Sequence, residues 1–285
     1  MKSAMLPQSV SAVPAPEVAP VVPVTVPGLQ RMKRERVRIV SVTAYDYTFA
    51  RLLDRAGVDL LLVGDSLGMV IQGHATTLPV TLEQMIYHTA AVVRGASRAM
   101  VVCDLPFGAC HGGGAVVMDA AVRVLKETGC QGVKLEGGVR VAEIIRYLTE
   151  HQIPVMGHVG LTPQSVHQFG GFKVQGRGED GERILADALA VADAGAFAVV
   201  LEGIPVSLAA RITDQLEIPT IGIGAGDSCD GQVLVLHDLL GLNDSFVPRF
   251  VKCYLPDNTV SQAVERFVDE VRTGQFPGKE HGFAD

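Results

Sequence analysis

Tryptophan is absent from this 285-residue sequence, and aromatic residues make up only 5% of it. Sites for carbohydrates and for unstacked nucleic-acid bases depend on aromatic surfaces, so this scarcity argues against both. Positive charge is also in short supply, because 24 Lys and Arg stand against 31 Asp and Glu, for a formal net charge of -7. We therefore expect neither nucleic acid nor an anionic membrane as a partner.

Paired cysteines and long apolar stretches are missing as well. The five cysteines form no CxxC pair, which indicates reduced thiols in a cytoplasmic protein. No stretch approaches the roughly 20 apolar residues of a membrane span. Five prolines between Pro14 and Pro27 argue against a helical secretory signal. We predict a disordered or extended N-terminal tail over residues 1–30, followed by one domain over residues 31–285.

Strand-length apolar runs alternate with segments of helical period from Val37 onward. The strands are expected at 37–42, 59–64, 99–103, 132–135, 154–157, 196–201, 219–223 and about 250–254. Helical segments separate the earlier strands, and a further helix follows Thr259. This α/β pattern predicts a (β/α)8 TIM barrel. A doubly wound open sheet is the alternative, but it usually carries a Gly-rich turn after its first strand, where this chain has Thr43-Ala44-Tyr45-Asp46.

Ionisable side chains end five consecutive predicted strands. They are Asp65, Asp104, Lys134 with Glu136, His158 and Glu202. Any one of them alone is explained equally well as a helix cap or a solvated turn. In a barrel, however, the carboxyl ends of all strands meet at one rim, where catalytic groups lie. Five such ends in succession therefore favour a functional site.

The four carboxylates of this rim would repel one another unless cations offset them. Lys134 supplies one positive charge, and a divalent ion would supply two more. Asp65, Asp104 and Glu136 offer hard oxygen donors, which suit Mg²⁺. Zinc is less favoured without a second His or a thiolate.

A hard metal with open positions suits a 2-keto acid, which can chelate it through a carboxylate and the ketone oxygen. Chelation would acidify the adjacent C–H group, and Glu202 is the free carboxylate expected to remove that proton. Lys134 and His158 would bind the substrate carboxylate or the enolate oxygen.

Two glycine-rich strings, 112–114 and 222–226, leave their interpretation open. Tight turns are the ordinary explanation, while close backbone approach to a ligand or to phosphate is the functional one.

Several longer strings resemble the ketopantoate hydroxymethyltransferase family. They include Asp65-Ser66-Leu67-Gly68-Met69-Val70, Val133-Lys134-Leu135-Glu136-Gly137-Gly138, Gly157-His158-Val159-Gly160-Leu161-Thr162-Pro163-Gln164-Ser165 and Ile221-Gly222-Ile223-Gly224-Ala225-Gly226. The likeness spans roughly residues 37–283. After Gly108 this chain departs from the family pattern, since residues 109–114 replace a Ser-Tyr-Gln-like string that family members often carry.

The resemblance implies a barrel of the phosphoenolpyruvate/pyruvate superfamily that acts in pantothenate synthesis. The family transfers a one-carbon unit from 5,10-methylenetetrahydrofolate to 3-methyl-2-oxobutanoate and forms 2-dehydropantoate. Its pattern implies Mg²⁺ on Asp65 and Asp104, completed by Glu136 directly or through water. It further implies keto-acid contacts from Asp65, Ser66, Asp104, Lys134 and His158, and Glu202 as the catalytic base. Family members are usually cytoplasmic homodecamers.

Two alternatives remain beside this interpretation. Another Mg²⁺-dependent C–C lyase of the same superfamily would use enolate chemistry without folate, but such enzymes typically carry a Lys-Cys-Gly-His-like string, which this sequence lacks. A barrel kept only for binding would have no need of five ionisable strand ends.

Overall fold

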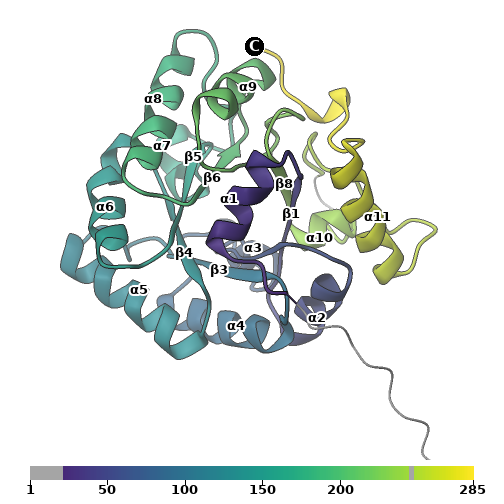
Figure 1. Ribbon diagram of the computed structural model, residues 1–285, viewed down its shortest axis with the longest axis horizontal. Coiled ribbons are helices and arrows are strands. Elements are labelled where there is room, and N and C mark those ends of the chain that lie inside the picture. Colours follow the sequence, from purple (N-terminus) through teal and green to yellow (C-terminus); the bar gives the residue numbers. More distant parts are fainter. Residues whose placement is uncertain (1–21, 244–246) are drawn as a thin grey trace, which may run out of the picture.

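The computed structural model describes residues 22–243 and 247–285. Its centre is a closed barrel of eight parallel strands that pair in sequence order, β1 through β8 and back to β1 (Figure 1). The strands are β1 (Ile39–Thr43), β2 (Leu60–Val63), β3 (Met100–Asp104), β4 (Gly132–Glu136), β5 (Val155–Gly160), β6 (Ala198–Glu202), β7 (Thr220–Ile223) and β8 (Gly231–Leu234). The predicted (β/α)8 barrel is thereby confirmed.

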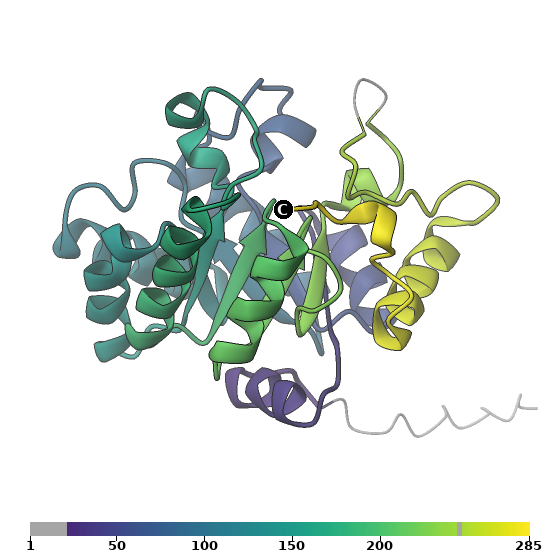
Figure 2. The same cartoon turned by 90° about the horizontal axis from the view of Figure 1, so that it is seen from above.

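Helices surround the barrel as an outer layer. They are α2 (Tyr47–Arg55), α4 (Leu82–Gly95), α5 (Gly114–Thr128), α6 (Ala142–Glu150), α8 (Asp180–Asp193), α9 (Val206–Gln215) and α11 (Val260–Thr273). Shorter helices, α3 (Leu67–Val70), α7 (Val166–Phe169) and α10 (Leu236–Leu239), follow β2, β5 and β8. Figure 2 shows these short helices and the longer loops on one side of the barrel. Among residues 22–243 and 247–285, no helix combines the length and apolar character that a membrane crossing requires.

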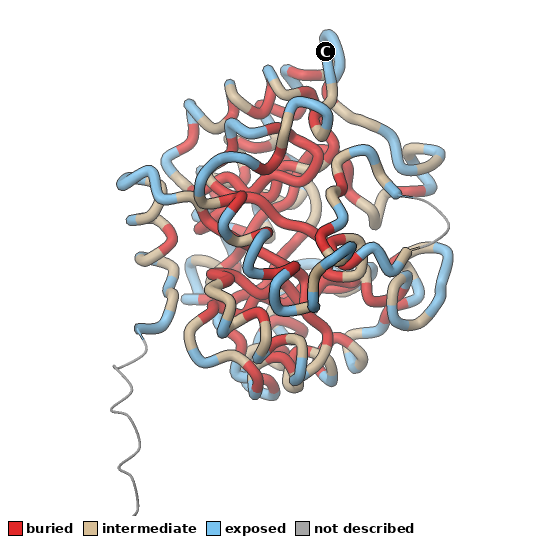
Figure 3. The backbone as a smooth tube through the Cα atoms, turned by 90° about the vertical axis from the view of Figure 1, so that its right-hand side faces the viewer, coloured by how far each residue is buried: buried red, intermediate tan, exposed pale blue. Residues whose placement is uncertain are grey.

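The strands are buried along nearly their whole length (Figure 3). The side chains on both of their faces pack into apolar clusters. One cluster fills the barrel interior and includes Leu60, Met100 and Met156. A larger cluster lies between the strands and the outer helices. Such two-sided burial is typical of parallel strands and makes the barrel a packed core, so a ligand can enter only at its ends.

Helix α1 (Val26–Arg34) corrects the prediction that residues up to 30 form a tail. The Thr25 side chain caps its first turn by accepting a hydrogen bond from the Gly28 amide, and Pro27 occupies a position where proline is tolerated. Leu29 is 1% exposed and packs into the interior cluster. Helix α1 therefore covers the amino-terminal end of the barrel (Figure 2), while residues 1–21 of the predicted tail lie outside the described residues.

Strand β8 lies at Gly231–Leu234, and the prediction of an eighth strand at 250–254 is wrong. The β7–β8 connection comprises residues 224–230 alone and contains no helix. Parallel strands are usually joined by a longer crossover with a helix, so the alternating pattern predicts the eighth strand too late in the chain. The other seven strands overlap their predicted ranges.

Helix α11 belongs to the barrel as its last outer helix. Its Arg272 forms an ion pair with Asp59 at 2.6 Å, and Asp59 also pairs with Arg98 at 2.6 Å. The Asp59 side chain is only 1% exposed and accepts a further hydrogen bond from the Val40 amide. This buried carboxylate connects α11 to β1 and to the segment that precedes β3.

Candidate active site

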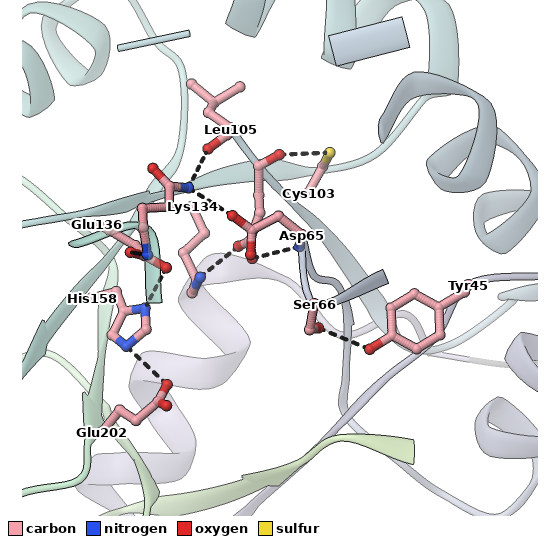
Figure 4. A network of polar contacts seen from close by, with 11 residues as sticks. Tyr45, Asp65, Ser66, Cys103, Leu105, Lys134, Glu136, His158 and Glu202 are labelled. Carbon is pink, nitrogen blue, oxygen red and sulfur yellow. Dashed lines mark hydrogen bonds and ion pairs between the residues drawn. The ribbon is translucent and has the colours of Figure 1, made fainter. Parts of the chain in front are cut away.

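The carboxyl-terminal end of the barrel holds a cavity of about 170 Å³. All seven site residues predicted from the sequence line it, namely Asp65, Ser66, Asp104, Lys134, Glu136, His158 and Glu202. They come from β2 through β6, and Figure 4 shows the labelled members converging on one space. Larger hollows elsewhere, such as one of about 520 Å³ beside α2 and α11, contain none of these residues.

Asp104 and Lys134 form a buried ion pair at the centre of this site. The Lys134 Nζ atom lies 2.6 Å from Asp104 Oδ1, and the two side chains are only 4% and 5% exposed. Burial by itself lowers the pKa of Lys134, but the negative charges of Asp104, Glu136 and Asp65 outweigh burial and raise it. Lys134 is therefore a permanent cation.

Asp65 lies beside this pair, since its backbone N–H donates to Asp104 Oδ2 at 3.1 Å. Burial and the charge of Asp104 raise the pKa of Asp65 to about 7, although Lys134 and a hydrogen bond from Gln164 act in the opposite direction. Burial and Asp65 likewise raise the pKa of Glu136 well above its usual range. The single positive charge of Lys134 thus offsets only part of the negative charge of the three buried carboxylates.

His158 lies between two carboxylates. Its Nδ1 atom is 3.6 Å from Glu136 Oε1, and its Nε2 atom is 3.2 Å from Glu202 Oε2 (Figure 4). Within the described chain neither ring nitrogen has a well-aligned hydrogen-bond partner. Burial and the charge of Lys134 lower the pKa of His158, so the ring is neutral near pH 7. A neutral imidazole can donate at one nitrogen and accept at the other.

Gly160 brings the ends of β5 and β6 together, which places Glu202 near His158. The Leu161 amide donates to the Glu202 carbonyl at 2.8 Å, and Gly160 has a φ angle of +94°. A Cβ atom at Gly160 would collide with the backbone of Glu202. Glycine is required here both for the backbone conformation and for the close approach.

Ser66 is held by a residue that strand-end reasoning missed. The Ser66 Oγ atom lies 2.9 Å from the phenol oxygen of Tyr45, which follows β1 (Figure 4). His88 in α4 contacts the Tyr45 carbonyl through Nδ1 at 2.7 Å. Tyr45 carries no charge in the normal range, because burial raises the pKa of its phenol. The rule that charged side chains end the strands therefore does not identify Tyr45.

Gln164 is the second residue that the sequence did not single out. Its side-chain amide donates to Asp65 Oδ2 at 2.8 Å, and its backbone N–H donates to Glu136 Oε2 at 2.9 Å. It belongs to the string 157–165, which begins within β5, but a neutral amide in a turn gives no signal of its own.

The donor set fits Mg²⁺ better than any softer metal. In residues 22–243 and 247–285, no group of three or more His, Cys, Asp or Glu side chains is arranged to hold a metal ion. Lys134 and Gln164 lie among the three carboxylates that the sequence proposed as ligands. Asp65 and Asp104 nevertheless stand side by side with excess negative charge. Mg²⁺ commonly uses one or two carboxylates and keeps its waters, so this pair fits it.

The glycine-rich string after β7 has a packing role. Gly224 has a φ angle of +61°, and a Cβ atom there would come within 2.9 Å of the Phe250 ring. Tight turning and close packing account for this glycine without any phosphate.

Solved structures of low sequence identity share the fold. A phosphoenolpyruvate phosphomutase from Streptomyces platensis superposes with a TM-score of 0.58 at 16% identity, covering 76% of this chain and 82% of that one. A 2,3-dimethylmalate lyase of the phosphoenolpyruvate mutase/isocitrate lyase superfamily superposes with a TM-score of 0.55 at 17% identity, covering 76% and 83%. At such identities the likeness concerns the fold alone.

Sequence relatives are much closer to this chain. The 3-methyl-2-oxobutanoate hydroxymethyltransferase of Trichlorobacter lovleyi is 56% identical over 92% of this chain and 98% of its own length. The protein of the same name from Magnetococcus marinus is 57% identical over 91% and 98%. The model of the family described as ketopantoate hydroxymethyltransferase matches residues 23–279. The chain thus belongs to the ketopantoate hydroxymethyltransferase family.

Proposed function

We propose that this protein transfers a hydroxymethyl group to 3-methyl-2-oxobutanoate, with 5,10-methylenetetrahydrofolate as the carbon donor, and forms 2-dehydropantoate. The observation that carries the proposal is the convergence of Asp65, Asp104, Lys134 and Glu202 on one buried cavity. Family membership favours this transfer over the folate-free lyase reaction that the sequence left open.

The keto acid would bind against the positive side of the cavity. Lys134 is a buried cation there, and it can pair with the substrate carboxylate or with an oxygen that gains charge during the reaction. The Ser66 hydroxyl, oriented by Tyr45, offers a second hydrogen bond. Bound Mg²⁺, held by Asp65 and Asp104, would polarise the ketone and make the C3 hydrogen more acidic.

Glu202 is the proposed base that removes the proton from C3. Its side chain is 17% exposed and lies next to a neutral His158, so it faces the cavity without a cationic partner there. His158 can steady one carboxylate oxygen of Glu202 by donating a hydrogen bond from Nε2. Water would cleave the methylene carbon from the folate nitrogens as formaldehyde, and the carbon left at C3 would then attack the formaldehyde carbon, whose oxygen becomes the new hydroxyl group.

The atoms balance when water takes part. C3 loses its hydrogen and gains the methylene carbon, which receives a hydroxyl group from water. Both bonds between the methylene carbon and the folate nitrogens break, and the hydrogen lost from C3 and the remaining hydrogen of water form the two N–H bonds of tetrahydrofolate. No external oxidant or reductant is needed.

The direct test of the proposal is a product assay with the purified protein. We expect 2-dehydropantoate to appear only when 3-methyl-2-oxobutanoate and 5,10-methylenetetrahydrofolate are both present, with one tetrahydrofolate released per product. Mass spectrometry identifies the product, and absorbance follows the folate. Product formation at an equal rate without folate would overturn the proposal.

The proposal includes action as a homo-oligomer in the cytoplasm, as the family resemblance implies. Apolar side chains on neighbouring outer helices support self-association. Tyr87 on α4 is 74% exposed, Val116 on α5 is 48% exposed, and Tyr147 on α6 is 37% exposed.

A further inference from the structure

Gln164 makes hydrogen bonds to three neighbouring strand ends although it does not line the cavity itself. Its Nε2 atom donates to Asp65 Oδ2 at 2.8 Å and to the Leu105 carbonyl at 3.0 Å. Its backbone N–H donates to Glu136 Oε2 at 2.9 Å. One residue that follows β5 therefore connects the groups that end β2, β3 and β4.

The turn that carries Gln164 is fixed from both sides. Pro163 begins a short 3₁₀ helix, Pro163–Ser165, directly after the end of β5. The Ser165 amide donates to the Thr162 carbonyl at 2.8 Å, and the Thr162 hydroxyl donates to Ser165 Oγ at 2.9 Å. This turn aims the Gln164 amide at Glu136 and leaves its side chain to reach Asp65.

The two carboxylates need such a neutral donor. Asp65 and Glu136 are buried close to Asp104, whose Oδ1 atom accepts a hydrogen bond from the ammonium group of Lys134. No second lysine or arginine lines the described cavity, so like charges would otherwise turn Asp65 and Glu136 away from each other. The donors of Gln164 satisfy one oxygen of each carboxylate without adding charge, which leaves the other oxygens for a ligand.

We propose that Gln164 is a positioning residue that holds Asp65 and Glu136 in the orientation needed to bind a hydrated divalent cation together with the keto acid. The inference rests on the proposed function but concerns a residue that is not among those lining the cavity. Hydrogen-bond partners of metal-binding carboxylates typically contribute 10- to 100-fold to metal affinity or activity. We assign Gln164 a contribution in this range.

The test replaces the side-chain donor and keeps the backbone donor. Gln164→Met retains the unbranched shape and the N–H group that contacts Glu136, but it cannot donate to Asp65. We expect about 10- to 100-fold weaker Mg²⁺ binding by calorimetry, and a similar loss in the rate of C3 deuterium exchange at saturating keto acid. Gln168→Met on α7 is the matched control, because Gln168 is exposed and outside the cavity, and it should match the wild type.

Melting temperature and circular dichroism separate positioning from folding. If Gln164→Met is partly unfolded, Gln164→Asn provides the second variant, since it keeps an amide in the same turn and should lose less Mg²⁺ affinity. The inference would be overturned if Gln164→Met bound Mg²⁺ and exchanged C3 within twofold of the wild type. It would also be overturned if the losses of Mg²⁺ binding and exchange in Gln164→Met only equalled the fraction of unfolded protein. Failure of the wild type to bind Mg²⁺ or to exchange C3 would instead count against the proposed function.

Discussion

Replacing Glu202 with Gln is expected to slow deuterium exchange at C3 of 3-methyl-2-oxobutanoate by about 10²- to 10⁴-fold, the usual contribution of a general base. The amide keeps the shape of the side chain and can still contact His158, which lies 3.2 Å away. It cannot accept the C3 proton. Proton NMR in deuterated water follows the exchange directly, because only the single C3 hydrogen is lost.

A matched control distinguishes loss of the base from loss of one negative charge. Glu217→Gln changes an exposed carboxylate between α9 and β7 and should exchange at the wild-type rate. Mg²⁺ affinity should also be unchanged in Glu202→Gln, since Glu202 is not one of the proposed ligands. Exchange in Glu202→Gln at the wild-type rate would assign the base to another residue.

Asp104→Ala is expected to abolish turnover and also to destabilise the protein by about 3–5 kcal/mol. The reason is the buried pair with Lys134, whose ammonium group would lose its partner at 2.6 Å while remaining 4% exposed. The loss of stability would not follow from a metal-binding role alone. Urea unfolding measures it, with activity recorded on the folded protein.

A double variant separates these two effects of Asp104. Adding Lys134→Met to Asp104→Ala removes the unpaired charge, so much of the lost stability should return while turnover stays absent. The exposed pair of Glu83 and Arg123, at 2.8 Å, provides the control, and Glu83→Ala should leave the urea midpoint nearly unchanged. Equal midpoints for Asp104→Ala and Glu83→Ala would contradict a strongly coupled buried pair.

Periodicity located most of the barrel because buried parallel strands are continuous apolar runs. It failed where local structure broke the pattern. Strand β8 follows β7 without a helix, and no pattern of alternating elements can anticipate a crossover made by residues 224–230. The prediction of a tail up to residue 30 is wrong at helix α1 for a different reason. Prolines argue against helix in general, but Thr25 and Pro27 together form a good helix start.

The charged part of the site could be predicted because a barrel brings its strand ends to one rim. Asp65, Asp104, Lys134 and Glu202 needed only this rule. Gln164 and Tyr45 could not be found in that way, because their importance lies in contacts with residues distant in sequence. The sequence also could not predict which carboxylate oxygens would bind the cation. Lys134 and Gln164 form hydrogen bonds to some of these oxygens, and these contacts are visible only in the three-dimensional structure.

The most direct test of the account is deuterium exchange at C3 of 3-methyl-2-oxobutanoate by the wild-type protein without any folate. The account predicts steady loss of the C3 proton signal in the presence of Mg²⁺, and its arrest when a chelator removes the ion. Addition of 5,10-methylenetetrahydrofolate should then convert the keto acid to product. Exchange that is absent with Mg²⁺, or that continues unchanged with the chelator, would contradict the central claim that this rim activates a keto acid on a divalent cation.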